Sequence, residues 1–389
     1  MIKGLGKKTL LSVVALLALT ACGDDTTTET VITPYKRVAV LPGTQADIEK
    51  IALKISDYVV NNDESQTLKF PTNWVIAGAN PHANETYDGN ADLIPIPIDT
   101  GSEVYKSRVI EFCNGAYATQ AIGTGQQHGS ALPCEVGVHS DGTNVYVDML
   151  DADAIFSLFF PGIEDPDGKL KAMAEAVQYE IREMIKAALS AETGFTESTL
   201  ALGPKFTQAD IAKIKDEDIY LVTKYTSNTG AIFTTTDAKN LAKSLITKMG
   251  TDDANADTLV TGLSVNSQWR SARPDPIAIP GVFVTEACSP TYAKMATRLG
   301  AEYLTALPCE ITAYLDRTDD TNKTLTISVL NPHFMFENMF KGAVENAVRD
   351  TNLSQTDAAK YETLAAIVLA DLNKIVDAAV ADSGLDLKK

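Results

Sequence analysis

Residues 113–135 read CNGAYATQAIGTGQQHGSALPCE, and residues 288–310 read CSPTYAKMATRLGAEYLTALPCE. The two segments align without a gap at an offset of 175 residues (288 minus 113), with identical residues at 10 of 23 positions. Composition alone would give roughly one or two identities in segments of this length. The sequence therefore carries two copies of one unit, and this internal repeat decides the fold prediction.

The repeat extends outward as two helical patterns of apolar residues. Apolar residues at steps of three and four are typical of amphipathic helices. The first pattern is Ile48, Ile51, Ile55 and Val59, matched by Ala238, Leu241, Leu245 and Met249; the second is Met173, Val177, Ile181, Met184 and Ala188, matched by Leu364, Val368, Leu372, Ile375 and Ala379. Asp47 and Asp237 are the predicted N-caps of the first helix in each copy.

Segments in which apolar and polar residues alternate predict the strands. They are 35–41, 107–112, 135–138 and 144–149 in the first copy, and 219–225, 281–285, 310–315 and 324–330 in the second. Asp141-Gly142 between two alternating runs indicates a hairpin, and a longer polar loop joins the equivalent strands of the second copy. We predict an α+β fold of two homologous domains, each a small, mostly antiparallel sheet covered by helices, related by pseudo-two-fold symmetry.

Five segments make up the predicted organisation. They are a lipoprotein signal peptide at 1–21, a flexible tether at 22–34, repeat domain 1 at 35–192, a linker at 193–216 and repeat domain 2 at 217–389.

The first 22 residues have the layout of a secretory signal. Lys3, Lys7 and Lys8 precede an apolar run at 10–19, which is shorter than the about 20 residues needed to cross a bilayer. The closing run Leu-Thr-Ala-Cys22 resembles the lipobox of bacterial lipoproteins, which implies cleavage before Cys22 and attachment of palmitate-type lipid to it. The alternatives are a plain signal peptide or a buried N-terminal helix.

Charge restricts the partners of this chain. It has 33 Lys+Arg against 51 Asp+Glu, a net charge of −18, which argues against binding nucleic acid. Anionic lipid headgroups should repel the body, so we expect it to stand away from the membrane on its tether. Gly23 after Cys22 resembles the sorting signal that favours the outer membrane in enteric bacteria. The predicted location is therefore the cell envelope, on the periplasmic face of the outer membrane.

Four cysteines remain after lipidation, in two equivalent pairs. An oxidising compartment permits the disulfides Cys113–Cys134 and Cys288–Cys309, each worth about 3 kcal/mol in the chain-entropy model. In a second interpretation, the cysteines are reactive. A short helix is predicted to start at the first cysteine of each pair, and it would lower the pKa of that thiol. Such thiols could exchange disulfides or bind a soft metal or haem iron. The sequence contains no Cys-x-x-Cys motif.

Together these motifs resemble a known family. A cysteine followed by Asn114-Gly115 or Ser289-Pro290, a helix with Tyr117-Ala or Tyr292-Ala, and a Leu-Pro-Cys strand entry are similar to the bacterial and archaeal domain of unknown function 302. The resemblance implies a small α+β domain that is often exported. It implies no activity, so no catalytic residue is carried over.

The leading hypothesis is a non-enzymatic binding or interaction module, with its pocket near the Cys-bearing helix ends or between the repeats. The partner would be a small ligand or an envelope protein. A thiol–disulfide redox protein, or one binding a soft metal or haem through cysteine, is the alternative. We predict no cofactor, and a monomer with an internal pseudo-dimer. The candidate residues are Cys22 for lipidation, and Cys113, Cys134, Cys288, Cys309, Tyr117 and Tyr292 for disulfide, redox or binding roles.

Overall fold

The chain is described here by a computed structural model. It describes residues 31–61, 67–76, 94–97, 104–132, 134–249, 270–271, 275–276, 280–306, 309–350 and 353–389. The predicted signal peptide, Cys22 and most of the predicted tether lie outside these residues.

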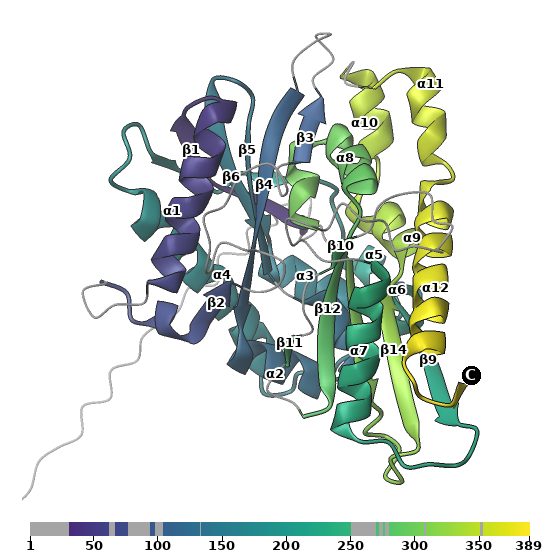
Figure 1. Cartoon of the computed structure of the whole chain (residues 1–389). Coiled ribbons are helices and arrows are strands. Elements are labelled where there is room, and N and C mark those ends of the chain that lie inside the picture. Colours follow the sequence, from purple (N-terminus) through teal and green to yellow (C-terminus); the bar gives the residue numbers. More distant parts are fainter. Residues whose placement is uncertain are drawn as a thin grey trace, which may run out of the picture.

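Two antiparallel sheets carry the fold, which is α+β as predicted (Figure 1). The first sheet has the order β2-β4-β5-β6-β1-β7, with β3 on β4 and β8 on β1. Its strands are β1 (Tyr35–Pro42), β2 (Trp74–Ile76), β3 (Ile94–Pro97), β4 (Val104–Asn114), β5 (Cys134–Ser140), β6 (Asn144–Leu150), β7 (Thr196–Glu197) and β8 (Ala201–Leu202).

The second sheet repeats this strand order as β10-β12-β13-β14-β9-β15, with β11 on β12. Its strands are β9 (Tyr220–Ser227), β10 (Arg270–Ser271), β11 (Asp275–Pro276), β12 (Val282–Cys288), β13 (Cys309–Leu315), β14 (Thr324–Leu330) and β15 (Leu387–Lys388). The central strands of each sheet follow the sequence predictions to within a few residues.

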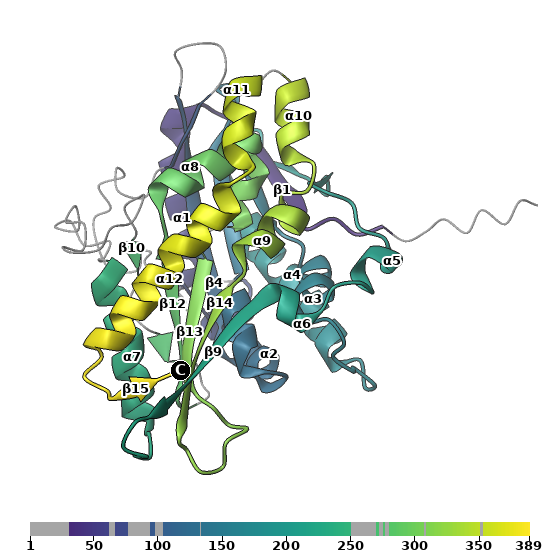
Figure 2. The same ribbon diagram turned by 90° about the vertical axis from the view of Figure 1, so that its right-hand side faces the viewer.

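Long helices cover one face of each sheet. α1 (Ile48–Val60) and α4 (Lys169–Leu189) pack together on the first sheet, while α7 (Thr235–Met249) and α12 (Leu364–Asp382) pack together and α7 contacts the second. Figure 2 shows α7 and α12 in front of the strands of the second sheet. No helix among the described residues is both long enough and apolar enough to cross a membrane.

Shorter helices connect these elements. They are η1 (Gln45–Asp47), η2 (Phe70–Asn73), α2 (Gly115–Gly123), η4 (Gln126–Ala131), α3 (Ala152–Phe159), α5 (Gln208–Ile211), α6 (Asp216–Ile219), α8 (Pro290–Leu299), η5 (Ala301–Ala306), α9 (Pro332–Phe334), η6 (Met335–Met339), α10 (Ala343–Arg349), α11 (Gln355–Ala358) and η7 (Ala359–Tyr361).

The predicted N-cap Asp47 does stand immediately before α1, whereas the prediction of Asp237 for the equivalent helix is wrong by three residues. The backbone N–H of Thr44 donates to the carboxylate of Asp47 at 2.8 Å, and that of Thr234 donates to Asp237 at 2.7 Å. Thr44 therefore caps η1, the 3-10 turn that leads into α1, Thr234 caps α7, and both aspartates occupy the third position of a capping box. Asp47 itself makes no side-chain cap bond to α1.

The predicted linker contributes two short strands to the first sheet, because β7 and β8 pair with β1. Ile32, near the end of the predicted tether, pairs with Phe206 of the linker in an isolated bridge of two backbone hydrogen bonds of 2.9 Å. The linker strands thus lie along the edge strand β1 of the central sheet.

We call residues up to 216, which carry the first sheet, the first half, and residues from 217, which carry the second sheet, the second half. The second face of each sheet is covered by a segment from the other half of the chain. η5 packs on β4, β5, β6 and β1, and η4 packs on β12, β13, β14 and β9. A Cβ at Gly137 would lie 2.9 Å from Cγ2 of Thr305, and one at Gly129 would lie 2.8 Å from Oγ1 of Thr312. Glycine at these two positions permits the close approach of each segment to the opposite sheet.

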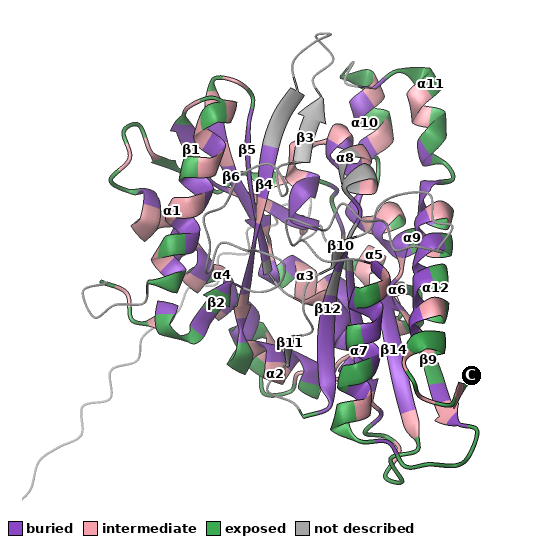
Figure 3. Ribbon diagram, viewed as in Figure 1, coloured by how far each residue is buried: buried purple, intermediate pink, exposed green. Residues whose placement is uncertain are grey.

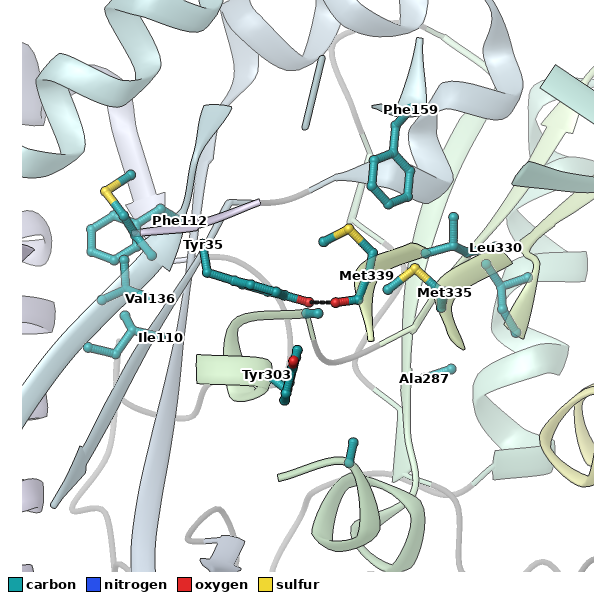
Figure 4. Close-up of a cluster of buried hydrophobic side chains, with 14 of the residues drawn as sticks. Tyr35, Ile110, Phe112, Val136, Phe159, Ala287, Tyr303, Leu330, Met335 and Met339 are labelled. Atoms are coloured by element: carbon teal, nitrogen blue, oxygen red, sulfur yellow. Dashed lines mark hydrogen bonds between the residues drawn. The ribbon is translucent and has the colours of Figure 1, made fainter. Parts of the chain in front are cut away.

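A single continuous cluster of buried apolar side chains runs through both halves. Figure 3 shows the buried strands between helices whose outer faces are exposed. Two tyrosines at equivalent strand positions tie the halves together: the hydroxyl of Tyr35 donates to the carbonyl of Met339 at 3.0 Å (Figure 4), and that of Tyr220 donates to Phe159 at 2.7 Å.

Candidate functional site

Strand pairing brings the predicted cysteine pairs onto neighbouring strands. Phe112 is the Cα partner of Cys134, so Cys113 lies one residue beyond it, and Cys288 lies one residue beyond Ala287, the partner of Cys309. The side chains of Cys134, Cys288 and Cys309 lie outside the described part of the structure. Both the disulfides and the redox alternative therefore stay predictions.

The helix after Cys113 starts later than the sequence analysis expected. Cys113 lies within β4, and Asn114 is the N-cap of α2, where its side-chain oxygen accepts from Ala116 N at 3.0 Å and Tyr117 N at 3.4 Å. Ser289 caps α8 in the same way. The first N–H groups of each helix are thus bound by a cap, which weakens the argument for a thiolate stabilised by that helix.

An apolar pocket lies beside this helix start in the first half. It encloses about 630 Å³, counting its open mouth, between the ends of β4 and β6 and helices α2, α3 and α4. None of its lining residues is Asp, Glu, Lys, Arg or His. They are Trp74, Phe112, Cys113, Asn114, Tyr117, Ala118, Ala121, Ala131, Leu132, Met149, Leu150, Ala152, Ile155, Phe156, Phe160 and Val177.

The carboxylate of Glu180 on α4 accepts hydrogen bonds from two of the aromatic residues that line this pocket. The hydroxyl of Tyr117 donates to Glu180 Oε1 at 2.7 Å, and the indole N–H of Trp74 donates to Oε2 at 2.6 Å. Burial, followed by the bond to Glu180, raises the pKa of Tyr117 to about 12. The polar atoms of both rings are therefore engaged, and each ring offers the pocket an apolar surface.

The second half repeats this pairing. The hydroxyl of Tyr292 donates to the buried carboxylate of Asp371 at 2.6 Å. Tyr117 and Tyr292 were predicted as candidates, whereas Glu180 and Asp371 were missed. The sequence did indicate that these two acids correspond, because they are related by the same offset of 191 (371 minus 180) that relates the two final helices.

A second pocket lies between the halves, and its volume of about 330 Å³ includes the open space at its mouth. Five residues from each half line this pocket, and they occupy equivalent positions in the two halves. Apart from one glutamate in each half, these residues are apolar. The residues are Ala131, Glu135, Leu150, Ile155 and Phe159 from the first half, and Ala306, Glu310, Leu330, Met335 and Met339 from the second. The first pocket thus lies beside the start of α2, and the second lies between the halves.

A charged cluster lies on the inner face of the first sheet and has no equivalent in the second. The buried carboxylate of Asp148 accepts from Arg37 Nε at 2.8 Å and lies 2.7 Å from Nε2 of His139. Burial raises the pKa of Glu302, which approaches this cluster from η5, and the charge of Asp148 raises it further. The equivalent residues of the second sheet, by strand register, are Val222, Tyr314 and Ser328.

Metal ligation finds no support within the described residues, where no group of three or more His, Cys, Asp and Glu side chains could hold an ion.

Comparison with known families finds a match in the first half of the chain. Residues 99–188 match the family model of DUF302, a domain of unknown function. The matched DUF302 segment includes β4 and extends to the penultimate residue of α4, and it contains Cys113, Cys134, Tyr117 and Glu180. No curated protein matches this chain.

Two solved structures show partial likeness. An uncharacterised DUF302 protein from Bacillus stearothermophilus aligns with 12% identity and a TM-score of 0.25, covering 40% of this chain and 97% of that one. The di-domain ARO/CYC BexL from the BE-7585A biosynthetic pathway aligns with 10% identity and a TM-score of 0.16, covering 89% and 98%. Both TM-scores are too low to support a fold or a function for this chain.

Proposed function

We propose that this chain is a non-enzymatic, lipid-anchored binding protein of the cell envelope, and that its first half binds a small, uncharged, largely apolar molecule. The pocket beside α2 carries this proposal. Its lining holds no Asp, Glu, Lys, Arg or His, and its two largest hydrogen-bonding aromatic residues, Trp74 and Tyr117, already donate to Glu180. Such a lining favours apolar contact and penalises a charged ligand that would lose its hydration.

Aromatic rings form two walls of this pocket. The ring centroids of Trp74 and Tyr117 lie 6.0 Å apart, and the rings of Phe156 and Phe160 are stacked with their centroids 4.6 Å apart. Aromatic side chains provide a large apolar contact area at low cost in conformational entropy. A ligand with a ring or a short alkyl chain would gain most from these walls.

Filling the pocket is expected to weaken binding at least about tenfold, which corresponds to about 1.4 kcal/mol. Ala118 and Ala121 line the pocket from α2, so Ala118→Leu and Ala121→Leu each place three more carbons there. The probe is the uncharged fluorophore N-phenyl-1-naphthylamine, titrated into the soluble chain from residue 23. Thermal unfolding of each variant checks that it is folded.

The matched control is Val222→Leu, which enlarges an exposed side chain of the second half. It should bind the probe as the native chain does. If the native chain does not bind the probe, or if folded pocket variants bind it as tightly as the control, the pocket is not the binding site.

The lipid anchor belongs to the same proposal and is supported by the lipobox-like run that ends at Cys22. Mass spectrometry of the protein from its host is expected to show an N-terminal Cys22 carrying acyl chains. Cys22→Ser should abolish incorporation of a labelled palmitate analogue, while Cys113→Ser should leave it unchanged. Equal labelling of both variants would exclude this anchor.

We also propose that the second half is a second copy of the matched domain, and that the two are related by an approximate two-fold axis. Three observations support it: the identical strand order, the reciprocal covering of the sheets by η4 and η5, and the paired hydrogen bonds of Tyr35 and Tyr220. Each half already covers the inner face of the other, so a monomer needs no further copy.

A further inference from the structure

The amide group of one asparagine in the apolar pocket is divided between two roles. Asn114 lines this pocket, and only 6% of its surface is exposed. Its side-chain oxygen accepts from the backbone N–H groups of Ala116 at 3.0 Å and Tyr117 at 3.4 Å. Because backbone N–H groups only donate, the atom that faces them is the oxygen, and Nδ2 is the other branch of the planar amide. No hydrogen bond from Nδ2 is found among the described residues.

The other hydrogen-bonding groups of the lining are already engaged. The indole N–H of Trp74 and the hydroxyl hydrogen of Tyr117 both go to Glu180. An indole and a phenol each have a single hydrogen to donate. The remaining lining side chains, Cys113 apart, are apolar. The Asn114 amide is therefore the N–H donor that this lining offers to a ligand.

Asn114 is held in place before any ligand binds. Its backbone pairs with that of Trp74, where β4 pairs with β2, and its side-chain oxygen caps α2. A side chain that is fixed in this way loses little conformational freedom when a ligand binds to it. A buried N–H donor is also unfavourable without an acceptor, so a ligand that supplies one is favoured over a purely apolar ligand.

The second half lacks this donor. The cap of α8 is Ser289, whose hydroxyl accepts from the backbone N–H of Tyr292 at 3.5 Å. Serine and asparagine are about equally favourable N-caps, so capping alone does not require an amide. The asparagine thus gives the first half a binding group that the equivalent serine does not carry.

We propose that the ligand of the first half is a neutral carbonyl compound, a ketone or ester with an apolar body, whose carbonyl oxygen accepts from Nδ2 of Asn114. This inference rests on the proposed binding function and adds the chemical class of the ligand. A neutral acceptor fits better than an anion, because the carboxylate of Glu180 bonds to two rings of the lining, and the lining contains no Lys, Arg or His.

Two probes of nearly the same shape separate the carbonyl oxygen from the apolar body. They are acetophenone and α-methylstyrene, which has a CH₂ group in place of that oxygen. Each is measured by displacement of N-phenyl-1-naphthylamine from the soluble chain. Asn114→Ser keeps a capping hydroxyl, as in the second half, and removes the amide. We expect it to weaken acetophenone binding at least about fivefold and α-methylstyrene binding less than about twofold.

A second variant tests the same donor with the side-chain shape retained. Asn114→Asp keeps the capping oxygen and replaces the NH₂ group by an oxygen that only accepts when ionised. It should weaken acetophenone binding at least as much as the serine variant does. The matched control is Asn373→Ser, at an exposed position of α12, and should bind both probes as the native chain does. Thermal unfolding of each variant checks that it is folded.

Two results would overturn this inference while leaving the proposed function intact. One is a folded Asn114 variant that loses no more affinity for acetophenone than for α-methylstyrene. The other is displacement of the fluorophore from the native chain by α-methylstyrene but not by acetophenone. Failure of the native chain to bind the fluorophore would instead overturn the proposed function, and this inference with it.

Discussion

Asp148→Asn is expected to lower the free energy of unfolding by about 3 kcal/mol. Asp148 is fully buried and bonds to both Arg37 and His139, so removing its charge leaves the Arg37 cation without its counterion. The expected loss lies at the low end for a buried pair because 17% of the Arg37 side chain is exposed and can take up water. Urea denaturation of both proteins at neutral pH measures the difference.

The pH dependence of this loss has a definite sign. Burial alone would raise the pKa of Asp148, but His139 and Arg37 outweigh it and hold that pKa below its ordinary value. A depressed pKa means that the carboxylate stabilises the fold above its unfolded-state pKa, and that this stability is lost as the pH falls through the folded-state pKa. The difference between native protein and variant should therefore shrink in acid.

The control is Ser328→Ala at the equivalent position of the second sheet. The Ser328 hydroxyl has no hydrogen-bond partner among the described residues, so its removal should change stability by less than about 0.5 kcal/mol. A loss of less than about 1 kcal/mol for Asp148→Asn, or a loss independent of pH, would show that the cluster does not stabilise the fold.

Gly137→Ala is expected to destabilise the chain by about 2 kcal/mol through overpacking between the halves. The new Cβ would lie 2.9 Å from Cγ2 of Thr305, which η5 presses onto β5. Thr305→Ser removes that methyl group and keeps the hydroxyl, which donates to the carbonyl of Glu302 at 2.8 Å. The double variant should therefore recover at least about 1 kcal/mol relative to the sum of the single changes.

Gly123→Ala is the matched control, because a Cβ there would meet no atom within 4 Å. It should leave stability unchanged or raise it slightly, since alanine restricts the unfolded chain. Additive effects of Gly137→Ala and Thr305→Ser in thermal unfolding would contradict the contact between η5 and the first sheet.

Much of the fold could be predicted because its helices and strands follow short-range periodic patterns of apolar residues. Val59 and Leu372 belong to helical patterns that the structure confirms, and Asp141-Gly142 turns the hairpin where it was expected, with Gly142 at φ 93°. The N-cap prediction failed at Asp237 because this residue stands next to the apolar pattern and satisfies the same residue preference as a true cap, whereas Asp47 does stand immediately before α1. Only the backbone shows that Thr44 and Thr234 precede them.

The candidate site was predicted in part. Tyr117 and Tyr292 were found because they recur in the aligned segments, while Glu180 and Asp371 lie in helices whose acids look like surface residues in the sequence. Glu135 and Glu310 were visible as the last identical residue of the repeat, yet nothing in the sequence places them in one pocket. Arg37 could not be grouped with His139 and Asp148, since it lies 111 positions before Asp148 along the chain.

The repeat, the helical and strand patterns and the negative charge followed from the amino-acid sequence alone, because each depends on composition or on residues a few positions apart. The tertiary structure alone decided that η4 and η5 each cover the opposite sheet, and that a shared pocket forms where the halves meet. Those contacts join residues some 175 positions apart, and their geometry depends on how two complete sheets pack, which no local pattern encodes.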